Sequence, residues 1–401
     1  MEVIIKIFGG SLIGGLLITA LIHLYKKHGF GLVNILKNSF GALFIFSAAV
    51  KAIDPLGTAY KMGEYFEELN LAFLHPLSLT FSVVMIVLEL ALALALIFAY
   101  KKQITLGLLF AMNIFFTFLT GYTTITGKVT DCGCFGDFLK LEPQQSFYKD
   151  IFLIFILIII YFGRDKIKEV FTGSKSLFIV LAASFVFLIF NFSNFYFDIP
   201  MVDFRPYAIG NDINEQRIEI PDQLDYGFKF KNESTGETKR VEMGEYGKYN
   251  ADPAWKFTGE QDNIVLKKGV EAKINNFGAF DRNGDDNTDD ILSYEGYSIW
   301  ILTKTISETD IDAWKNIKAL ETFTKANNHR IFAFSASVYA ETDVFKKENN
   351  LSLDFYEADD IFIKTVVRAN PGIVLLKNGK VQAKWHHRHI PSVDEIKALI
   401  K

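Results

Sequence analysis

The chain has 401 residues, of which half are apolar, 39 are Phe and only two are Cys. Its formal net charge of −4 is unevenly divided, because residues 1–197 carry 15 Lys and Arg against 12 Asp and Glu, which leaves −7 for the remainder. An acidic second half is unfavourable for binding nucleic acid or anionic lipid. The sequence therefore excludes nucleic acid as the expected partner.

Six apolar runs lie in the first half of the chain. About 20 apolar residues are needed to cross a bilayer, and the second and fifth runs are the shortest. The first run has only one basic residue near its start, Lys6, and no small-residue cleavage site is evident, so we expect a retained span rather than a signal peptide. The six expected spans are Val3–Leu24, Ser39–Ile53, Leu77–Tyr100, Ile104–Thr124, Phe147–Phe162 and Leu177–Phe197.

The loops between these runs alternate in charge. Basic residues follow the first, third and fifth runs: Lys26, Lys27, Lys37, Lys101, Lys102, Arg164, Lys166, Lys168 and Lys175. The other loops are acidic or mixed and hold Asp54, Glu64, Glu67, Glu68, Asp131, Asp137 and Glu142. Lys and Arg favour the cytoplasmic side. We therefore expect a bacterial inner-membrane protein whose N-terminus and whole C-terminal half lie on the periplasmic side.

Both cysteines, Cys132 and Cys134, lie in the motif Asp-Cys-Gly-Cys-Phe-Gly-Asp at 131–137, in a loop expected outside. Two thiols one residue apart can close a small strained ring that is easily reduced, and Gly133 permits the tight backbone. The alternatives are a structural staple, a pair of inert thiols, or a metal or haem ligand. The flanking carboxylates disfavour a thiolate, and two sulfurs are too few for a closed zinc site.

An ionisable residue, Glu89, lies in the middle of the third run. Such residues are costly in a membrane and point to function. Glu89 is expected to be neutral or paired with Lys51, and to relay protons or to meet the head group of a quinone. The alternative is a structural hydrogen bond between helices, which is also the expected role of Asn113 in the next run.

The membrane half resembles a known superfamily. Residues 40–54, FGALFIFSAAVKAID, resemble the opening helix of DoxX-family membrane proteins, with Ser47 and Lys51 at the serine and lysine of that pattern and Glu89 in a DoxX-like third span. The Cys-Gly-Cys-Phe-Gly loop resembles the MauE (methylamine-utilisation) branch, which is associated with making disulfides in exported proteins. The resemblance implies a four-helix core from spans two to five, with one added span on each side.

The C-terminal half reads as soluble. Residues 198–221 are rich in Pro and predict a linker, and residues 223–265 form short alternating segments that predict a small antiparallel β unit. We place this linker and β unit at 198–267, after the membrane domain 1–197 and before an α/β domain at 268–401.

The last domain has a β-α-β-α-β-β-α order. The expected elements are Tyr297–Thr303, Asp310–Lys325, Arg330–Phe334, Ala340–Glu348, Gly372–Leu376, Val381–Trp385 and Asp394–Ile400. An Asn378-Gly379 turn joins the last two strands, which is a strong hairpin signal. The order resembles the thioredoxin fold, and Ile274–Leu292 resembles the N-terminal hairpin of periplasmic thioredoxin-like reductases.

This resemblance implies that Pro371 is cis and faces the segment Lys304–Asp310. Members of that family carry a redox C-x-x-C in this segment, but here it holds no cysteine, so the domain cannot run a disulfide exchange alone. The expected partner groove is formed by Lys304, Thr305, Ile306 and Ser307 together with Pro371.

Two further motifs could hold metals. Asp281–Asp289 has oxygen ligands at alternate positions, but its sixth and twelfth positions do not fit a calcium loop, so a hairpin turn is expected. His386, His387 and His389 follow the last strand, where neighbours point to opposite faces, so we expect a solvated strand end and no metal.

Two functions remain open. In the first, the C-x-C loop of a redox-associated membrane protein passes electrons between exported thiols and a membrane acceptor such as quinone. In the second, the chain is a non-enzymatic anchor in the lipid bilayer whose redox-dead thioredoxin-like domain binds an exported client or an envelope protein complex.

Overall fold

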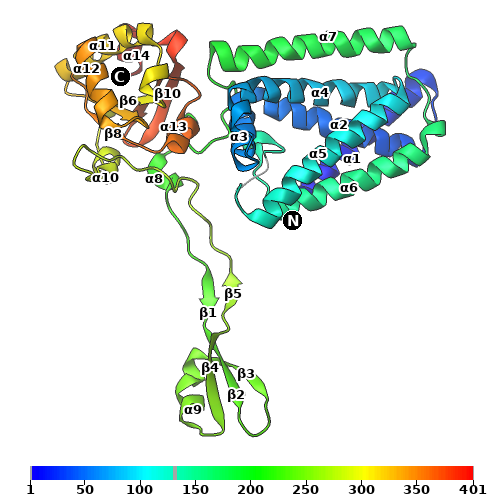
Figure 1. The fold of residues 1–401 in the computed structure, drawn as a ribbon, viewed down its shortest axis with the longest axis horizontal. Helices are drawn as coiled ribbons and strands as arrows, with labels where there is room; N and C mark the ends of the chain where they lie inside the picture. Colours follow the sequence, from blue (N-terminus) through cyan, green and yellow to red (C-terminus); the bar gives the residue numbers. More distant parts are fainter. Residues whose placement is uncertain (1, 130–132, 401) are drawn as a thin grey trace.

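The computed structural model describes residues 2–129 and 133–400, and it has three visible parts (Figure 1). A helical bundle is formed by the N-terminal half. An α/β domain lies beside the bundle, next to helix α3. A small β unit projects away from both on a narrow two-stranded ribbon.

The bundle contains six described helices that are long and apolar enough to cross a membrane. Their bounds are α1 (Glu2–Lys26), α2 (Leu32–Ile53), α4 (Ser78–Phe98), α5 (Lys102–Thr126), α6 (Pro143–Phe162) and α7 (Gly173–Phe192), the last continued by a π-helical turn, Ser193–Phe197. The prediction of six spans is confirmed.

One lysine was placed wrongly by the sequence. Lys37, expected in a basic loop, lies inside α2, which begins seven residues earlier than predicted, and is only 2% exposed. Its Nζ donates to the carbonyls of Leu96 (3.2 Å) and Ile97 (2.5 Å), where α4 ends. The last carbonyls of a helix lack partners within the helix and attract a cation, which explains why a lysine is tolerated there.

Helix α3 (Pro55–Glu68) was not predicted and connects the second and third spans. Asp54 caps it by accepting from the Gly57 backbone N–H, and Pro55 fits the first helical position. Met62 and Tyr65 lie on its buried face. The acidic residues that the sequence assigned to a loop, such as Glu64, therefore lie on an amphipathic helix.

The C-terminal domain is built on a five-stranded sheet in the order β10-β9-β6-β7-β8. The three parallel strands are β6 (Tyr297–Thr303), β7 (Arg330–Ser335) and β8 (Phe355–Glu357). β9 (Gly372–Lys377) is antiparallel to β6 and to β10 (Lys380–His386). This is the strand arrangement of a thioredoxin-like domain, as predicted.

Both faces of this sheet are covered. Along β6, Ile299 and Ile301 belong to one hydrophobic cluster, and Trp300 and Leu302 to another, as the alternation of a strand requires. Helices α11 (Ile311–Ala326), α12 (Tyr339–Asn349) and α14 (Val393–Leu399) contribute to the first cluster, and α13 (Asp360–Val366) to the second.

Three details of the domain differ from the expectation. β8 and α13 were missed, because three residues of strand and seven of helix are too short to show a period. The expected N-terminal hairpin at 274–292 is short: a turn closed by one antiparallel bridge, Phe280 with Asp286, followed by helix α10 (Thr288–Leu292). In the turn, the Asp281 carboxylate accepts from the backbone N–H groups of Asn283 and Asp285, which is the tight-turn geometry favoured over a calcium loop.

The small β unit is antiparallel, as predicted. Its sheet is formed by β2 (Gly227–Asn232), β3 (Thr238–Glu242) and β4 (Trp255–Gln261), with helix α9 (Tyr246–Ala251) beside it. β1 (Gln223–Asp225) and β5 (Ile264–Lys267) form the ribbon that carries it (Figure 1).

The segment expected to be a linker contacts the α/β domain closely. Tyr207 and Ile213, the latter in the short helix α8 (Ile213–Gln216), are fully buried in its core. Gly210 donates its N–H to the carbonyl of Val381 on β10. These residues fold with the domain, and the domain limits at 197 and 267 stay predictions.

We expect Asp203→Asn to weaken the α/β domain in a pH-dependent way. The Asp203 carboxylate contacts Arg205 Nε at 2.6 Å and Lys384 Nζ at 2.8 Å. Burial alone would raise the pKa of Asp203, but these two cations outweigh it and hold the pKa at about 2. Because the pKa is below its ordinary value, the carboxylate stabilises the fold above about pH 4, and this contribution is lost as the pH falls toward 2.

The substitution should therefore lower the free energy of unfolding by about 2 kcal/mol at pH 7 and by little near pH 2. All four tryptophans lie in residues 255–385, so tryptophan fluorescence of the intact protein reports this half alone. Asp394→Asn, at a carboxylate that is 90% exposed, is the control and should be nearly neutral. A loss of equal size at both pH values would contradict the assignment.

Candidate functional site

The loop that carries the cysteine motif at 131–137, called the thiol loop below, lies against helix α2. Its described part begins at Gly133, and the predicted site residue Cys132 lies outside the described residues. The carbonyl of Cys134 accepts a hydrogen bond from Ser47 Oγ (3.0 Å). Gly136 has a φ of 53°, and a Cβ built on it would lie 3.7 Å from the Lys51 side chain, so the loop approaches α2 closely.

An ion pair lies beneath this loop. Lys51 Nζ is 2.5 Å from Glu89 Oε2, and the two side chains are 6% and 3% exposed. Ser47 Oγ is also 3.4 Å from Glu89 Oε1. The structure therefore brings together Ser47, Lys51, Glu89 and Cys134, and it contains the Lys51–Glu89 pairing that the sequence analysis gave as one of two alternatives. The catalytic roles of Glu89 and the cysteines stay predictions.

A cavity of about 70 Å³ connects these groups. Its apolar lining includes Phe44, Met85 and Phe116, and its polar lining includes Lys51, Glu89 and Cys134. A cavity of this size with several polar groups has room for ordered water. The thiol loop and the buried charges thus border one polar space inside a membrane bundle.

Several polar residues of this cavity were not assigned a role from the sequence. Lys149 and Asp150 form a buried ion pair, and Thr120 Oγ1 donates to Asp150 Oδ2 (3.1 Å). The signal was present, because these two charges interrupt the fifth apolar run. Asn113 is 1% exposed, and its amide oxygen and nitrogen have no hydrogen-bond partner among the described residues. The expected interhelical hydrogen bond of Asn113 is therefore not seen.

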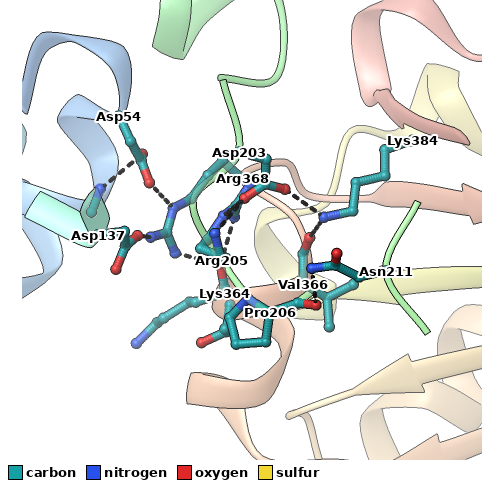
Figure 2. Close-up of polar contacts among 12 residues, drawn as sticks. Asp54, Asp137, Asp203, Arg205, Pro206, Asn211, Lys364, Val366, Arg368 and Lys384 are labelled. Atoms are coloured by element: carbon teal, nitrogen blue, oxygen red, sulfur yellow. Dashed lines mark hydrogen bonds and ion pairs between the residues drawn. The ribbon is translucent and has the colours of Figure 1, made fainter. Parts of the chain in front are cut away.

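The thiol loop is also held from the side of the α/β domain (Figure 2). Arg368 Nη2 donates to Asp137 Oδ2 (2.7 Å), three residues after Cys134, and Arg368 Nε donates to Asp54 Oδ2 (2.8 Å). Burial alone would raise the pKa of Asp54, but the charges of Arg368 and Arg205 and two hydrogen bonds leave it below its usual value. Burial raises the pKa of Asp137, with Asp54 adding to this effect against the pull of Arg368. Asp54 is therefore the firmly charged partner.

Further contacts join the same two parts. The cations of Lys364 and Arg368 each lie 5.1 Å from the ring centroid of Tyr60 on α3. Phe138, after the thiol loop, packs edge-to-face on Phe204 with 5.1 Å between ring centroids. The interface is thus partly ionic and partly aromatic.

The predicted partner groove lies next to this interface. The Asn370–Pro371 peptide bond is cis, as expected. Asn370 faces the expected segment, because its Nδ2 donates to the carbonyl of Thr305 (3.0 Å). Ile306 is buried, and Lys304 Nζ lies 6.0 Å from the Tyr60 ring. Neither these contacts nor the position of Ser307 identifies a partner, so the groove stays a prediction.

The expectation of a solvated strand end is wrong for His386. It is 2% exposed because it remains in the β ladder opposite Gly372, and its Nδ1 accepts from the Arg388 N–H. Burial and the neighbouring cations lower the pKa of His386 to about 3, so it is neutral at physiological pH. His387 Nε2 lies 3.9 Å from Asp310 Oδ2. Among the described residues, no group of three His, Cys, Asp or Glu side chains is arranged to hold a metal ion.

Taken together, the fold and the site define a polytopic membrane protein with a thiol loop on its bundle and a thioredoxin-like α/β domain after it. The family described as "Methylamine utilisation protein MauE" matches residues 30–163, about a third of the chain. This range contains Ser47, Lys51, Glu89 and the thiol loop. The finer likeness to the DoxX family stays a prediction.

One relative is "Protein TlpB" of Flavobacterium psychrophilum, which is 30% identical over 131 residues, or 32% of this chain and 35% of that protein. This chain thus spans about a third of the length of that relative. Solved structures with some likeness include a thiol:disulfide interchange protein from Bacteroides sp., at 14% identity and a TM-score of 0.24, covering 27% of this chain and 76% of that one.

Another is the thioredoxin domain of a thiol-disulfide oxidoreductase from Bacteroides vulgatus, at 14% identity and a TM-score of 0.25, covering 31% of this chain and 92% of that one. These sequence identities and TM-scores are too low to support an argument, so the description of the α/β domain as thioredoxin-like depends on its strand order.

We expect Lys51→Met to destabilise the bundle strongly, because it leaves the Glu89 carboxylate buried without a cation. Breaking one side of a buried pair typically costs about 3–5 kcal/mol. The double variant Lys51→Met/Glu89→Leu should recover part of this loss, because both charges are gone. Thermal unfolding of the detergent-solubilised protein, followed by circular dichroism, measures both.

The matched control is Lys128→Met. It breaks a Lys–Glu pair of similar length, Lys128–Glu68 at 2.7 Å, whose side chains are 55% and 31% exposed. Solvent screens an exposed pair, so its contribution to stability is small. If Lys51→Met proved as mild as this control, the Lys51–Glu89 pair would not be the structural support that its burial indicates.

Proposed function

We propose that this chain is a redox-associated inner-membrane protein. Its Cys132/Cys134 loop exchanges disulfides with exported thiol proteins and passes the electrons to a membrane acceptor such as a quinone. The single observation that carries this proposal is that Cys134 borders the same cavity as the Lys51–Glu89 pair. A thiol group and buried groups able to hold a proton therefore share one site.

The proposed cycle has two balanced halves. A client dithiol attacks the Cys132–Cys134 disulfide, that disulfide breaks, and the client leaves as a disulfide after giving up two electrons and two protons. The reduced cysteines then lose two electrons and two protons to the acceptor. A quinone that accepts both becomes a quinol, and the loop disulfide is restored.

The buried charges have a defined task in this proposal. The Glu89 carboxylate takes up a proton that a thiol releases, and the Lys51 amine, 2.5 Å away, is the partner of this carboxylate in the resting site. The cavity wall presents aromatic and polar groups together, since Lys51 Nζ lies 5.6 Å from the centroid of the Phe116 ring.

The proposal requires the thiol loop to face the oxidising side of the membrane. Single probe cysteines in a cysteine-free variant should react with a membrane-impermeant maleimide in intact cells at Glu64 and Glu142. A probe at Lys166, in a basic loop and exposed, should react only after the membrane is permeabilised. Reaction at Lys166 in intact cells would place the thiol motif in the reducing cytosol and remove the proposal.

We expect each of the variants Cys132→Ser and Cys134→Ser to accumulate a mixed disulfide with an exported protein, because the resolving thiol is gone. Non-reducing gels of cells trapped with acid detect it. The double variant should insert normally and trap nothing. If the double variant leaves the disulfides of exported proteins unchanged, the electron-transfer function is wrong.

We expect Glu89→Gln to slow reoxidation of the reduced loop, because the amide cannot take up the released proton. The expected loss is about 100- to 10,000-fold, measured by quenched-flow alkylation of loop thiols after a pulse of reductant. Formation of the mixed disulfide by Cys134→Ser should persist in this background, since it precedes the proton step. An unchanged reoxidation rate would limit Glu89 to a structural role.

A second function is favoured by one feature of the sequence: the segment Lys304–Asp310 carries no cysteine. In this alternative, the chain is a membrane anchor whose thioredoxin-like domain and projecting β unit bind an envelope protein complex. The two functions differ in whether the cysteines are required. A scaffold with both cysteines replaced by serine keeps its partners and its effect on growth.

A further inference from the structure

Arg368 connects the two parts of the molecule at one point (Figure 2). Its two carboxylate partners come from opposite sides of the candidate site. Asp54 follows the end of α2, three residues after Lys51, and Asp137 follows Cys134 by three residues. One guanidinium therefore ties the helix that carries the buried lysine to the loop that carries the thiols.

The orientation of the guanidinium is fixed on every side. Nε binds Asp54, Nη2 binds Asp137, and Nη1 donates to the carbonyl of Lys364, at the end of α13. The side chain is 6% exposed and lies over the ring of Tyr60. Only the planar fork of an arginine can serve three acceptors in this way.

Helix α3 is shaped to admit this contact. A Cβ built on Gly57 would lie 2.9 Å from Asp54 Oδ2, 3.0 Å from Arg368 Nη2 and 3.3 Å from Asp137 Oδ2. A side chain at this position would push apart the three charged groups. The close approach of the α3 backbone therefore depends on a glycine at the joint.

On the α/β side, one carboxylate is shared by two cations. Arg205 pairs with Asp203, which also pairs with Lys384, and the Lys364 carbonyl accepts from both Arg205 and Arg368. Figure 2 shows this network continuing to Asp54 and Asp137. If Arg368 withdrew, Asp54 and Asp137 would lose the cation that contacts both of them, and like charges in a buried site repel. The loop would then move away from α2.

We propose that the α/β domain is a positioning cap for the thiol loop, and that Arg368 is the positioning residue which holds Cys134 over the cavity through Asp137. The biological role of this cap rests on the proposed function, but the experiment below measures only the accessibility of Cys134 and does not require electron transfer. The domain has no thiol of its own, and the segment just before Pro371 instead contacts the thiol loop of the bundle, through the Asp137 carboxylate. When the contact between Arg368 and Asp137 breaks, the thiol loop becomes accessible to an exported protein.

The experiment measures the accessibility of Cys134 in the full chain with Cys132→Ser, so that one thiol remains. The probe is a membrane-impermeant maleimide added to reduced membrane vesicles. Arg368→Gln should raise the alkylation rate of Cys134 at least tenfold. Arg368→Lys keeps a charge but can serve only one carboxylate well, so its rate should lie between those of Arg368→Gln and the parent.

Asp137→Asn tests the route of the effect. Asp137→Asn should raise the alkylation rate of Cys134 as Arg368→Gln does. The double variant should show no further increase, because both substitutions remove the same contact, that between Arg368 and Asp137. The matched control is Arg388→Gln, since Arg388 also joins the α/β domain to the bundle by stacking 4.0 Å over Tyr196 but does not contact the loop. This control should label at the parent rate.

Tryptophan fluorescence checks that the α/β domain of each variant is folded. If the Arg368→Gln variant does not fold, the comparison of Arg368→Lys with the parent still decides the test. Parent-like labelling of folded Arg368→Gln and Arg368→Lys would overturn the cap. Faster labelling with Arg388→Gln as well would also overturn it, because detachment of the domain in general would then suffice. Faster labelling confined to Arg368 and Asp137 supports the cap even where the cysteines prove to carry no electrons.

Discussion

The structure depends on one carboxylate, that of Asp54. One of its oxygens accepts the N–H of Gly57 and so begins helix α3, and the other accepts from Arg368 of the α/β domain. Helix α3 in turn supplies Met62 and Tyr65 to the cavity wall. The capping of a helix, the closing of a cavity and the docking of a domain thus share a single side chain, and a buried carboxylate with this many donors is held in its charged form.

The membrane helices could be predicted from the sequence, because the length of an apolar run is enough to define each of them. The prediction was wrong at two places where charged residues lie within an apolar helical pattern. Lys37 interrupted an apolar pattern and was taken as a loop, although helix-end carbonyls on α4 receive its amine. Helix α3 was overlooked for the opposite reason, because its acidic exposed face concealed an apolar stripe. Asp54-Pro55 was a usable signal for its start.

The candidate site was only partly accessible from the sequence. Ser47, Lys51, Glu89 and Cys134 could each be selected because a polar group in an apolar run, or a cysteine in a chain that has two, stands out locally. Arg368 could not, since its partners are 231 and 314 residues away and no local pattern marks it. Contacts between residues this far apart in the sequence depend on how the bundle and the α/β domain pack together. Sequence periodicity does not predict that packing.

The ribbon that carries the β unit has a consequence for the architecture of the chain. Ile220 and Val270 exchange backbone hydrogen bonds of 2.9 and 2.8 Å, so the chain departs and returns at adjacent points. Residues 221–269 therefore form a removable cassette, closed at its base and independent of the sheet that follows. Insertions, exchanges and deletions within this cassette leave the backbone path of the α/β domain intact. The chain can thus acquire or lose this β unit without altering the joint at Asp54.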